Sequence, residues 1–229
     1  MSETRGIEIF LSYSHRDQEL RDELAKHLRM LNRQGTVAVW YDRKIAPAEH
    51  WEEEIDRHLN SANLILLLIT PDYLASDYHY NLEIRRALER HAAGEAKVIP
   101  IILRPVDWQF SDFARLQALP RNGKPVTTWP DRDAAFSDIA KGIRDAVEEI
   151  SQKDISKGND FIKSEILSIL RKYKSLPLLE IESISGFDIK ELQRSVQQLE
   201  REDLVRISNP EDILEEIVTA KRKVFLMSE

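Results

Sequence analysis

The chain has 229 residues, of which 42% are hydrophobic and 32% are charged, and its formal net charge is −7. This length predicts two compact units with packed cores, and the negative charge argues against a protein built mainly to bind nucleic acid. The longest apolar run, LILLLI at residues 64–69, is far shorter than the roughly 20 residues of a membrane-spanning helix. The lack of cysteine excludes disulfides and thiolate nucleophiles. The lack of cysteine and the lack of a signal-peptide pattern at the N-terminus together predict a cytoplasmic protein.

Residues 1–150 alternate apolar runs with amphipathic segments, which predicts strands that alternate with helices. The predicted strands are residues 7–13, 36–42, 63–70 and 97–103, with a weaker fifth at 124–129. The helix after the first strand has leucines at helical spacing, namely Leu20, Leu24, Leu28 and Leu31. This order predicts a flavodoxin-like α/β domain around a five-stranded parallel sheet.

The alternation ends near residue 150. Residues 151–160 are polar and are predicted to be a linker. Residues 161–229 then show an amphipathic helix, a short helix, a turn at Gly186, a longer helix and an apolar strand. This order predicts a mostly helical, winged helix-turn-helix-like domain. Its last 20 or so residues fit either wing strands or a terminal helix.

The charge of the second predicted domain bears on its partner. Residues 151–229 contain 13 Lys and Arg against 15 Asp and Glu, a net charge of −2. The predicted recognition helix carries Lys190, Arg194 and Arg201 beside five acidic residues, whereas a DNA-reading helix presents a basic face. We therefore expect residues 161–229 to contact a protein partner or regulator. The basic patch at residues 220–224 leaves DNA as the less favoured alternative.

Parallel α/β sheets bind ligands at the carboxyl ends of their strands. The segments there, residues 12–17, 40–51, 70–83 and 104–108, contain neither a glycine-rich phosphate loop nor a Gly-x-Ser-x-Gly elbow. Histidines are not spaced as metal ligands, and we expect His27, His58 and His91 at helix edges. The sequence therefore predicts no metal site and no tightly bound cofactor.

Four segments, EIFLSYSHRD, VWYDRKIAPAEHWEEEI, LLLITPDYLASDYH and VIPIILRPVDW, occur in this order. Together they resemble the prokaryotic TIR (Toll/interleukin-1 receptor/resistance) domain over residues 7–150. Many members cleave the nicotinamide–ribose bond, so the resemblance implies an NAD⁺ glycohydrolase, with NAD⁺ as substrate and nicotinamide plus ADP-ribose or a cyclic variant as products. It also implies activation by self-association in prokaryotic defence signalling. The alternative is a non-enzymatic TIR scaffold for protein–protein interaction.

The catalytic glutamate of the family matches Glu83, a few residues beyond the SDYH box at 76–79. The apolar stripe predicted for this helix contains Tyr80, Ile84, Ala87, Leu88 and His91. On an α-helical wheel Glu83 lies at the shoulder of that stripe, facing neither the core nor open water. The pattern alone also fits an acid that offsets the helix dipole or pairs on the surface. The catalytic role is what the resemblance implies.

The resemblance also implies residues that contact the substrate. Residues 42–51 match the BB loop, which in the family covers the site and contacts a neighbouring subunit. The glycine that the family usually has near Ala48 or Glu49 is absent, and His79 replaces its Cys or Trp. The implied substrate-binding residues are Tyr13, Ser14, His15, Asp42, Pro47, Trp51, Ser76 and His79.

Overall fold

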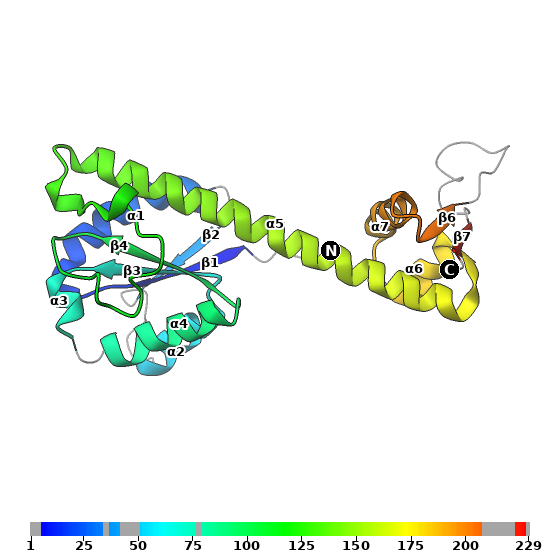
Figure 1. The fold of residues 1–229 in the computed structure, drawn as a ribbon, viewed down its shortest axis with the longest axis horizontal. Coiled ribbons are helices and arrows are strands. Elements are labelled where there is room, and N and C mark those ends of the chain that lie inside the picture. The colour runs from blue at the N-terminus through cyan, green and yellow to red at the C-terminus, as the bar shows by residue number, and fades with distance from the viewer. Residues whose placement is uncertain (1–5, 34–36, 42–50, 77–78, 208–222, 228–229) are drawn as a thin grey trace. The chain divides into compact units, whose positions relative to one another are not determined.

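The computed structural model describes residues 6–33, 37–41, 51–76, 79–207 and 223–227. The chain divides into two compact units, Met1–Ser151 and Gln152–Glu229, and Figure 1 shows the elements of each. Within the described ranges, no helix is both long enough and apolar enough to cross a membrane.

A four-stranded parallel sheet with the order β2–β1–β3–β4 forms the centre of the first unit (Figure 1). Its strands are β1 (Ile7–Ser12), β2 (Val37–Trp40), β3 (Leu64–Ile69) and β4 (Lys97–Ile102). The chain starts in the interior of the sheet, moves to one edge and then crosses to the other side, as in flavodoxin-like folds. The predicted parallel α/β fold is confirmed.

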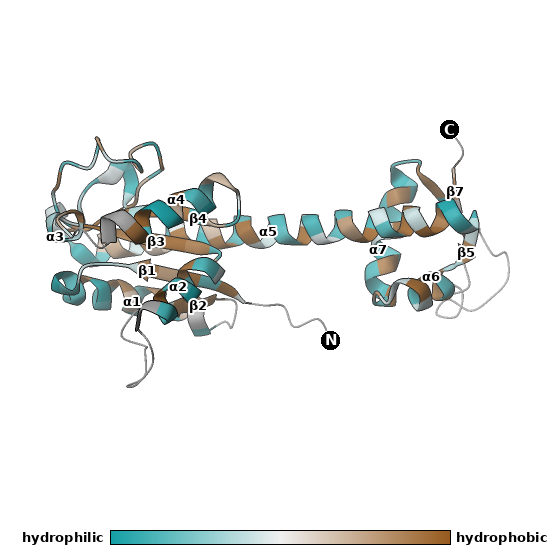
Figure 2. Ribbon diagram, turned by 90° about the horizontal axis from the view of Figure 1, so that it is seen from below, coloured by the Kyte–Doolittle hydropathy of each residue, from teal (hydrophilic) through white to brown (hydrophobic). Residues whose placement is uncertain are grey.

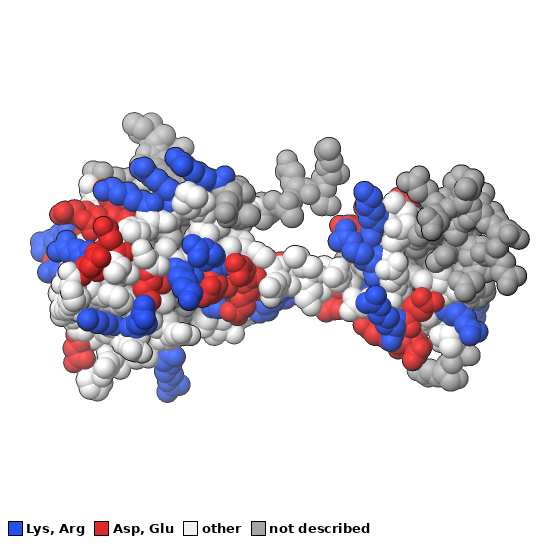
Figure 3. All heavy atoms as spheres, turned by 90° about the horizontal axis from the view of Figure 1, so that it is seen from above, with Lys and Arg blue, Asp and Glu red and all other residues white. Residues whose placement is uncertain are grey.

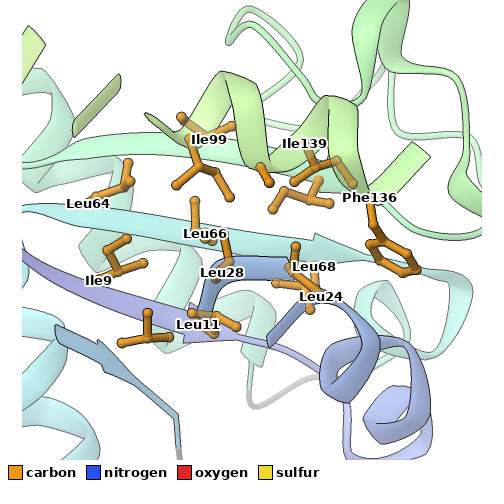
Figure 4. Packing of buried hydrophobic residues seen from close by; sticks show 14 of the residues in the cluster. Ile9, Leu11, Leu24, Leu28, Leu64, Leu66, Leu68, Ile99, Phe136 and Ile139 are labelled. Atoms are coloured by element: carbon orange, nitrogen blue, oxygen red, sulfur yellow. The ribbon is translucent and has the colours of Figure 1, made fainter. Parts of the chain in front are cut away.

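Helices cover both faces of this sheet because its strands are apolar on both faces. One face packs against α1 (Gln18–Arg33) and the first part of α5 (Arg132–Tyr173). Figure 4 shows this packing, in which Leu24 and Leu28 of α1 meet the sheet beside Phe136 of α5. The leucines of α1 are buried, as their helical spacing predicts.

The opposite face packs against α2 (Trp51–Ser61), α3 (Pro71–Leu74) and α4 (Arg85–Ala92). All six residues of β3 are buried, and Figure 2 shows the strands of the sheet as hydrophobic ribbons between helices of mixed character. A strand that is covered on both faces needs an unbroken apolar run, and LILLLI provides it.

The predicted fifth strand at residues 124–129 is wrong. Residues Val126–Thr128 form a short 3-10 helix. The backbone amide of Thr127 donates a hydrogen bond to the carbonyl oxygen of Leu103 at 3.1 Å. Next to β4, Leu119 makes an isolated parallel bridge to Ile101. Pro125 fixes its own φ and has no amide to donate, so this segment is poorly suited to extend the sheet.

The predicted linker at residues 151–160 is helical and belongs to α5. The segment contains a single glycine and no proline, and its Lys, Gln and Ser side chains are compatible with a helix. Polarity alone therefore did not distinguish an irregular connection from an exposed stretch of helix.

The described residues of the second unit comprise the end of α5, two further helices and a small sheet. The helices are α6 (Leu178–Ser185) and α7 (Ile189–Arg201), and Gly186 ends α6 at a left-handed φ of 73°. The antiparallel sheet has the order β5–β7–β6. Its strands are β5 (Ser175–Pro177), β6 (Val205–Ile207) and β7 (Lys223–Leu226). The last 20 or so residues were predicted to form either wing strands or a terminal helix, and the described residues there include a strand, β7.

Candidate active site

The strands β1, β3 and β4 run parallel, so their carboxyl ends lie at one edge of the sheet. The segments that follow β1 and β3 at this edge are a 3-10 helix, η1 (His15–Asp17), the short helix α3 and a π-helical turn, η3 (His79–Ile84). Because ligands of parallel α/β sheets bind beyond this edge, the candidate site lies there.

Glu83 contributes a buried carboxylate to this edge. The residue is 3% exposed, and its Oε2 accepts a hydrogen bond from the hydroxyl of Ser12, the last residue of β1. The Oγ of Ser12 also lies 2.7 Å from the phenolic oxygen of Tyr73, a fully buried residue of α3. Three side chains from three separate elements therefore form one buried polar group at the end of β1.

Glu83 is more deeply buried than the α-helical wheel predicts, and the predicted shoulder position is wrong. The residue lies in the π-helical turn η3, whose hydrogen bonds span five residues and whose turn is wider than that of an α-helix. The wider turn changes the angular position of Glu83 relative to α4. From residue 82 to the end of α4, where burial is described, the buried positions are Glu83, Ile84, Ala87 and Arg90, whereas Leu88 and His91 are half-buried. Single π-helical turns are rare and occur frequently at functional sites.

A second polar cluster ties the ends of three strands together. Asp17, which is 3% exposed, accepts hydrogen bonds from Thr70 Oγ1 at 2.5 Å and from Arg104 at 3.2 Å. Arg104 also donates to Asp72 at 2.5 Å, and Arg16 donates to Asp72 at 3.0 Å. The hydrogen bond from Arg104, followed by that from Arg16, lowers the pKa of Asp72. This cluster links the segments that follow β1, β3 and β4.

The predicted residues after β1 are placed in different environments. Tyr13, the residue after β1, is buried and packs in the core cluster that includes the leucines of α1. There the guanidinium of Arg21 lies 4.7 Å from the centre of the Tyr13 ring. Ser14 is buried, and His15 is exposed at the carboxyl edge. The binding roles of Tyr13, Ser14 and His15 stay predictions.

The other predicted substrate-binding residues are described in part. Ser76 is half-buried just beyond α3. His79 and Trp51 begin η3 and α2, but their side chains lie outside the described parts of the structure. Asp42 and Pro47, with the rest of the predicted BB loop up to residue 50, also lie outside the described residues. Their binding roles stay predictions.

Sequence reasoning missed the hydroxyl groups that accompany Glu83. Ser12 and Thr70 are polar residues at the ends of the apolar strands β1 and β3, and Tyr73 follows three residues after Thr70. A polar side chain at that position of a parallel strand is a usable signal, because it lies at the ligand-binding edge. The partners of these hydroxyls come from distant parts of the chain, and no local pattern identifies them.

Metal ligands are not grouped in the described part of the chain, where no cluster of three or more His, Asp or Glu side chains could hold an ion. His27, His58 and His91 are half-buried on helices. The ring of His58 stacks on Trp40 with 4.2 Å between the ring centres and contacts Glu8, so it takes part in packing.

The sheet order defines a parallel α/β domain, and polar groups lie at the carboxyl edge, where such sheets bind their ligands. The model of the TIR domain family matches residues 9–124, about half of the chain. The chain therefore belongs to the TIR domain family.

The chain is also 51% identical over 144 residues to "Uncharacterized protein y4lF" of Sinorhizobium fredii (strain NBRC 101917 / NGR234). This match covers 63% of the chain but only 45% of that relative, so the chain spans less than half of the relative's length.

The lowered pKa of Asp72 predicts a pH-dependent contribution to stability. Arg104 and Arg16 bind the ionised carboxylate, so the folded state releases the Asp72 proton more readily than the unfolded state does. The contribution is fully present above the ordinary pKa of 3.8 and is lost as the pH falls below it, through the lowered folded value. We expect Arg104→Gln to destabilise the first unit near neutral pH and to reduce the loss of stability in acid.

Urea unfolding followed by tryptophan fluorescence from about pH 7 to about pH 3 measures this effect. All four tryptophans lie between residues 40 and 129, so the signal reports on the first unit. Arg85→Gln is the matched control, because Arg85 is 77% exposed and its ion pair with Glu89 is 3.8 Å long. Parallel stability–pH curves for wild type and Arg104→Gln would contradict the prediction.

Proposed function

We propose that this chain is an NAD⁺ glycohydrolase in which Glu83 acts directly on the ribose of the substrate. The observation that carries the proposal is the buried carboxylate of Glu83 at the carboxyl edge of a parallel sheet, hydrogen-bonded to the last residue of β1. Membership of the TIR domain family, which includes NAD⁺-cleaving enzymes, supports the choice of substrate. The π-helical turn that contains Glu83 supports a functional rather than a structural role.

The chemistry of nicotinamide release suits a lone carboxylate. The bond between C1′ of the ribose and the pyridinium nitrogen breaks, and its electron pair neutralises the nicotinamide, so no general acid has to protonate the leaving group. The ribose then carries oxocarbenium-like positive charge, as in glycoside hydrolysis. The Glu83 carboxylate stabilises this charge and accepts hydrogen bonds from ribose hydroxyls. Water adds at C1′ and loses a proton to give ADP-ribose, or an adenine nitrogen adds there to give a cyclic product.

Self-association of the TIR domains is the proposed means of activation, in a prokaryotic defence signalling role. The competing function is a scaffold that signals through association of TIR domains alone. The test is nicotinamide release from NAD⁺ by the purified chain, measured at low and at high protein concentration and with a crowding agent. We expect release that rises more steeply than the protein concentration. No release under any of these conditions would contradict the enzymatic proposal and favour the scaffold.

For the second unit we propose a winged helix-turn-helix-like module that contacts a protein partner. The order helix, strand, helix, helix, strand, strand supports the module, with its antiparallel sheet of order β5–β7–β6. The face of this unit in Figure 3 carries acidic and basic side chains together, which supports a protein partner over DNA. Binding of the full chain to labelled duplex DNA at low salt, weakening as salt is added, would contradict this preference.

A further inference from the structure

We propose that Ser12 and Tyr73 are positioning residues for Glu83, linked in a directed chain in which Tyr73 donates to Ser12 and Ser12 donates to the carboxylate. The inference rests on the proposed function of Glu83 and adds the residues through which the fold sets the orientation of that carboxylate. Neither residue is proposed to touch the substrate.

The direction of the chain follows from a count of protons. The Ser12 hydroxyl has a single hydrogen and donates it to Glu83 Oε2. It can therefore only accept in its 2.7 Å contact with Tyr73, so the phenol must be the donor. Burial, and then the negative charge of Glu83, raise the pKa of Tyr73 well above its usual range. The phenol therefore keeps its proton near neutral pH.

The two donors are themselves held by rigid parts of the fold. Ser12 is paired with Leu67 in the register of β1 and β3, and it is 2% exposed. Tyr73 is fully buried, and its backbone amide donates to Thr70 Oγ1 at 3.0 Å in the cap of α3. A carboxylate fixed by such donors needs little reorganisation when charge develops on the substrate.

The surroundings of Ser12 indicate that its hydroxyl does more than fill space in the core. Apart from Tyr73 and Glu83, its neighbours on this side of the sheet include the apolar residues Phe10, Ile65 and Leu67. A hydroxyl buried in such a place costs free energy unless its hydrogen bonds are made, and an alanine would avoid that cost. Ser12 uses its hydroxyl for two contacts, and both belong to the chain that ends at Glu83.

Steady-state kinetics of nicotinamide release by the full chain test the inference. Ser12→Ala removes a hydrogen bond to a charged group, and we expect kcat to fall roughly 10- to 100-fold with KM nearly unchanged. Tyr73→Phe removes only the neutral bond to Ser12, and we expect a fall of about 2- to 10-fold. Ser12→Thr keeps the hydroxyl on a residue that suits a strand, and we expect it to restore most of kcat.

The double variant separates a directed chain from general packing. If Tyr73 acts only through Ser12, the Ser12→Ala/Tyr73→Phe variant has the kcat of Ser12→Ala within about twofold. Multiplying losses would overturn the inference. Ser195→Ala is the matched control, because Ser195 is 1% exposed in the second unit and its hydroxyl makes no hydrogen bond among the described residues. We expect this control to keep the wild-type kcat.

The remaining outcomes also decide the question, provided that circular dichroism and tryptophan fluorescence show folded variants. A Ser12→Ala kcat equal to or above that of an active wild type would overturn the inference while the proposed function stands. An increase would mean that the hydrogen bond restrains Glu83 in a resting position. A wild-type chain that releases no nicotinamide under the activating conditions contradicts the proposed function, and the inference fails with it.

Discussion

Glu83→Gln is expected to lower the kcat for nicotinamide release by about 100- to 1000-fold, because the amide has nearly the same shape but no negative charge. The loss of charge removes the stabilisation of the oxocarbenium-like ribose, whereas the volume and the partner Ser12 stay in place. The measurement is nicotinamide formation from NAD⁺ by chromatography, at enzyme concentrations at which the wild-type chain is active.

Glu89→Gln provides the matched control for this experiment. Glu89 lies six residues further along in α4, its side chain is 54% exposed, and it pairs with Arg85 and Arg86 on the surface. The same change of charge there is expected to leave kcat within about twofold, because exposed ion pairs contribute little. A folded Glu83→Gln variant with the wild-type rate would exclude Glu83 as the catalytic residue.

Phe136→Ala is expected to destabilise the first unit by about 3–5 kcal/mol. Phe136 is fully buried in the part of α5 that packs on the sheet (Figure 4). Its ring stacks on that of His27 in α1 with 5.5 Å between the ring centres. Removing the ring loses buried apolar area and leaves a cavity between α1, α5 and the sheet. Urea unfolding followed by tryptophan fluorescence measures the change in the free energy of unfolding.

Phe110→Ala is the control, since this phenylalanine is 92% exposed. We expect it to change the free energy of unfolding by no more than about 0.5 kcal/mol. Because all four tryptophans belong to the first unit, the second unit does not contribute to this signal. Equal unfolding midpoints for the two variants would show that α5 does not stabilise the sheet through Phe136.

Strong local patterns predicted much of the first unit. The four apolar runs became the four parallel strands, since an uninterrupted apolar segment between amphipathic helices has few other stable arrangements. The fifth predicted strand failed because Pro125 and the hydrogen bond from Thr127 to Leu103 favour a 3-10 helix. β5 was missed because a three-residue strand has no pattern of its own and depends on pairing with β7.

The candidate site, like the fold, was predicted only in part from the sequence. Glu83 was selected from the sequence through its motif, but its depth of burial was not predicted, because α-helical periodicity does not apply to a π-helical turn. The polar clusters around Asp17 and Ser12 were not predicted at all. Their contacts join residues 53 and 71 positions apart in the chain, and such pairs have no sequence spacing to recognise.

The sequence by itself determined the alternation of strands and helices and the apolar runs that fill the sheet, whereas the catalytic role of Glu83 is what the resemblance to the TIR family implies. The alternation and the apolar runs depend on neighbours in the chain, whose periodicity is visible in the residues. Only the tertiary structure decided that Ser12, Tyr73 and Glu83 meet, and that Asp17 and Arg104 connect the ends of three strands. The physical reason is that parallel strands bring their carboxyl ends to one edge of the sheet, whatever their separation in the chain. The residues that meet at this edge become hydrogen-bond donors and acceptors for one another.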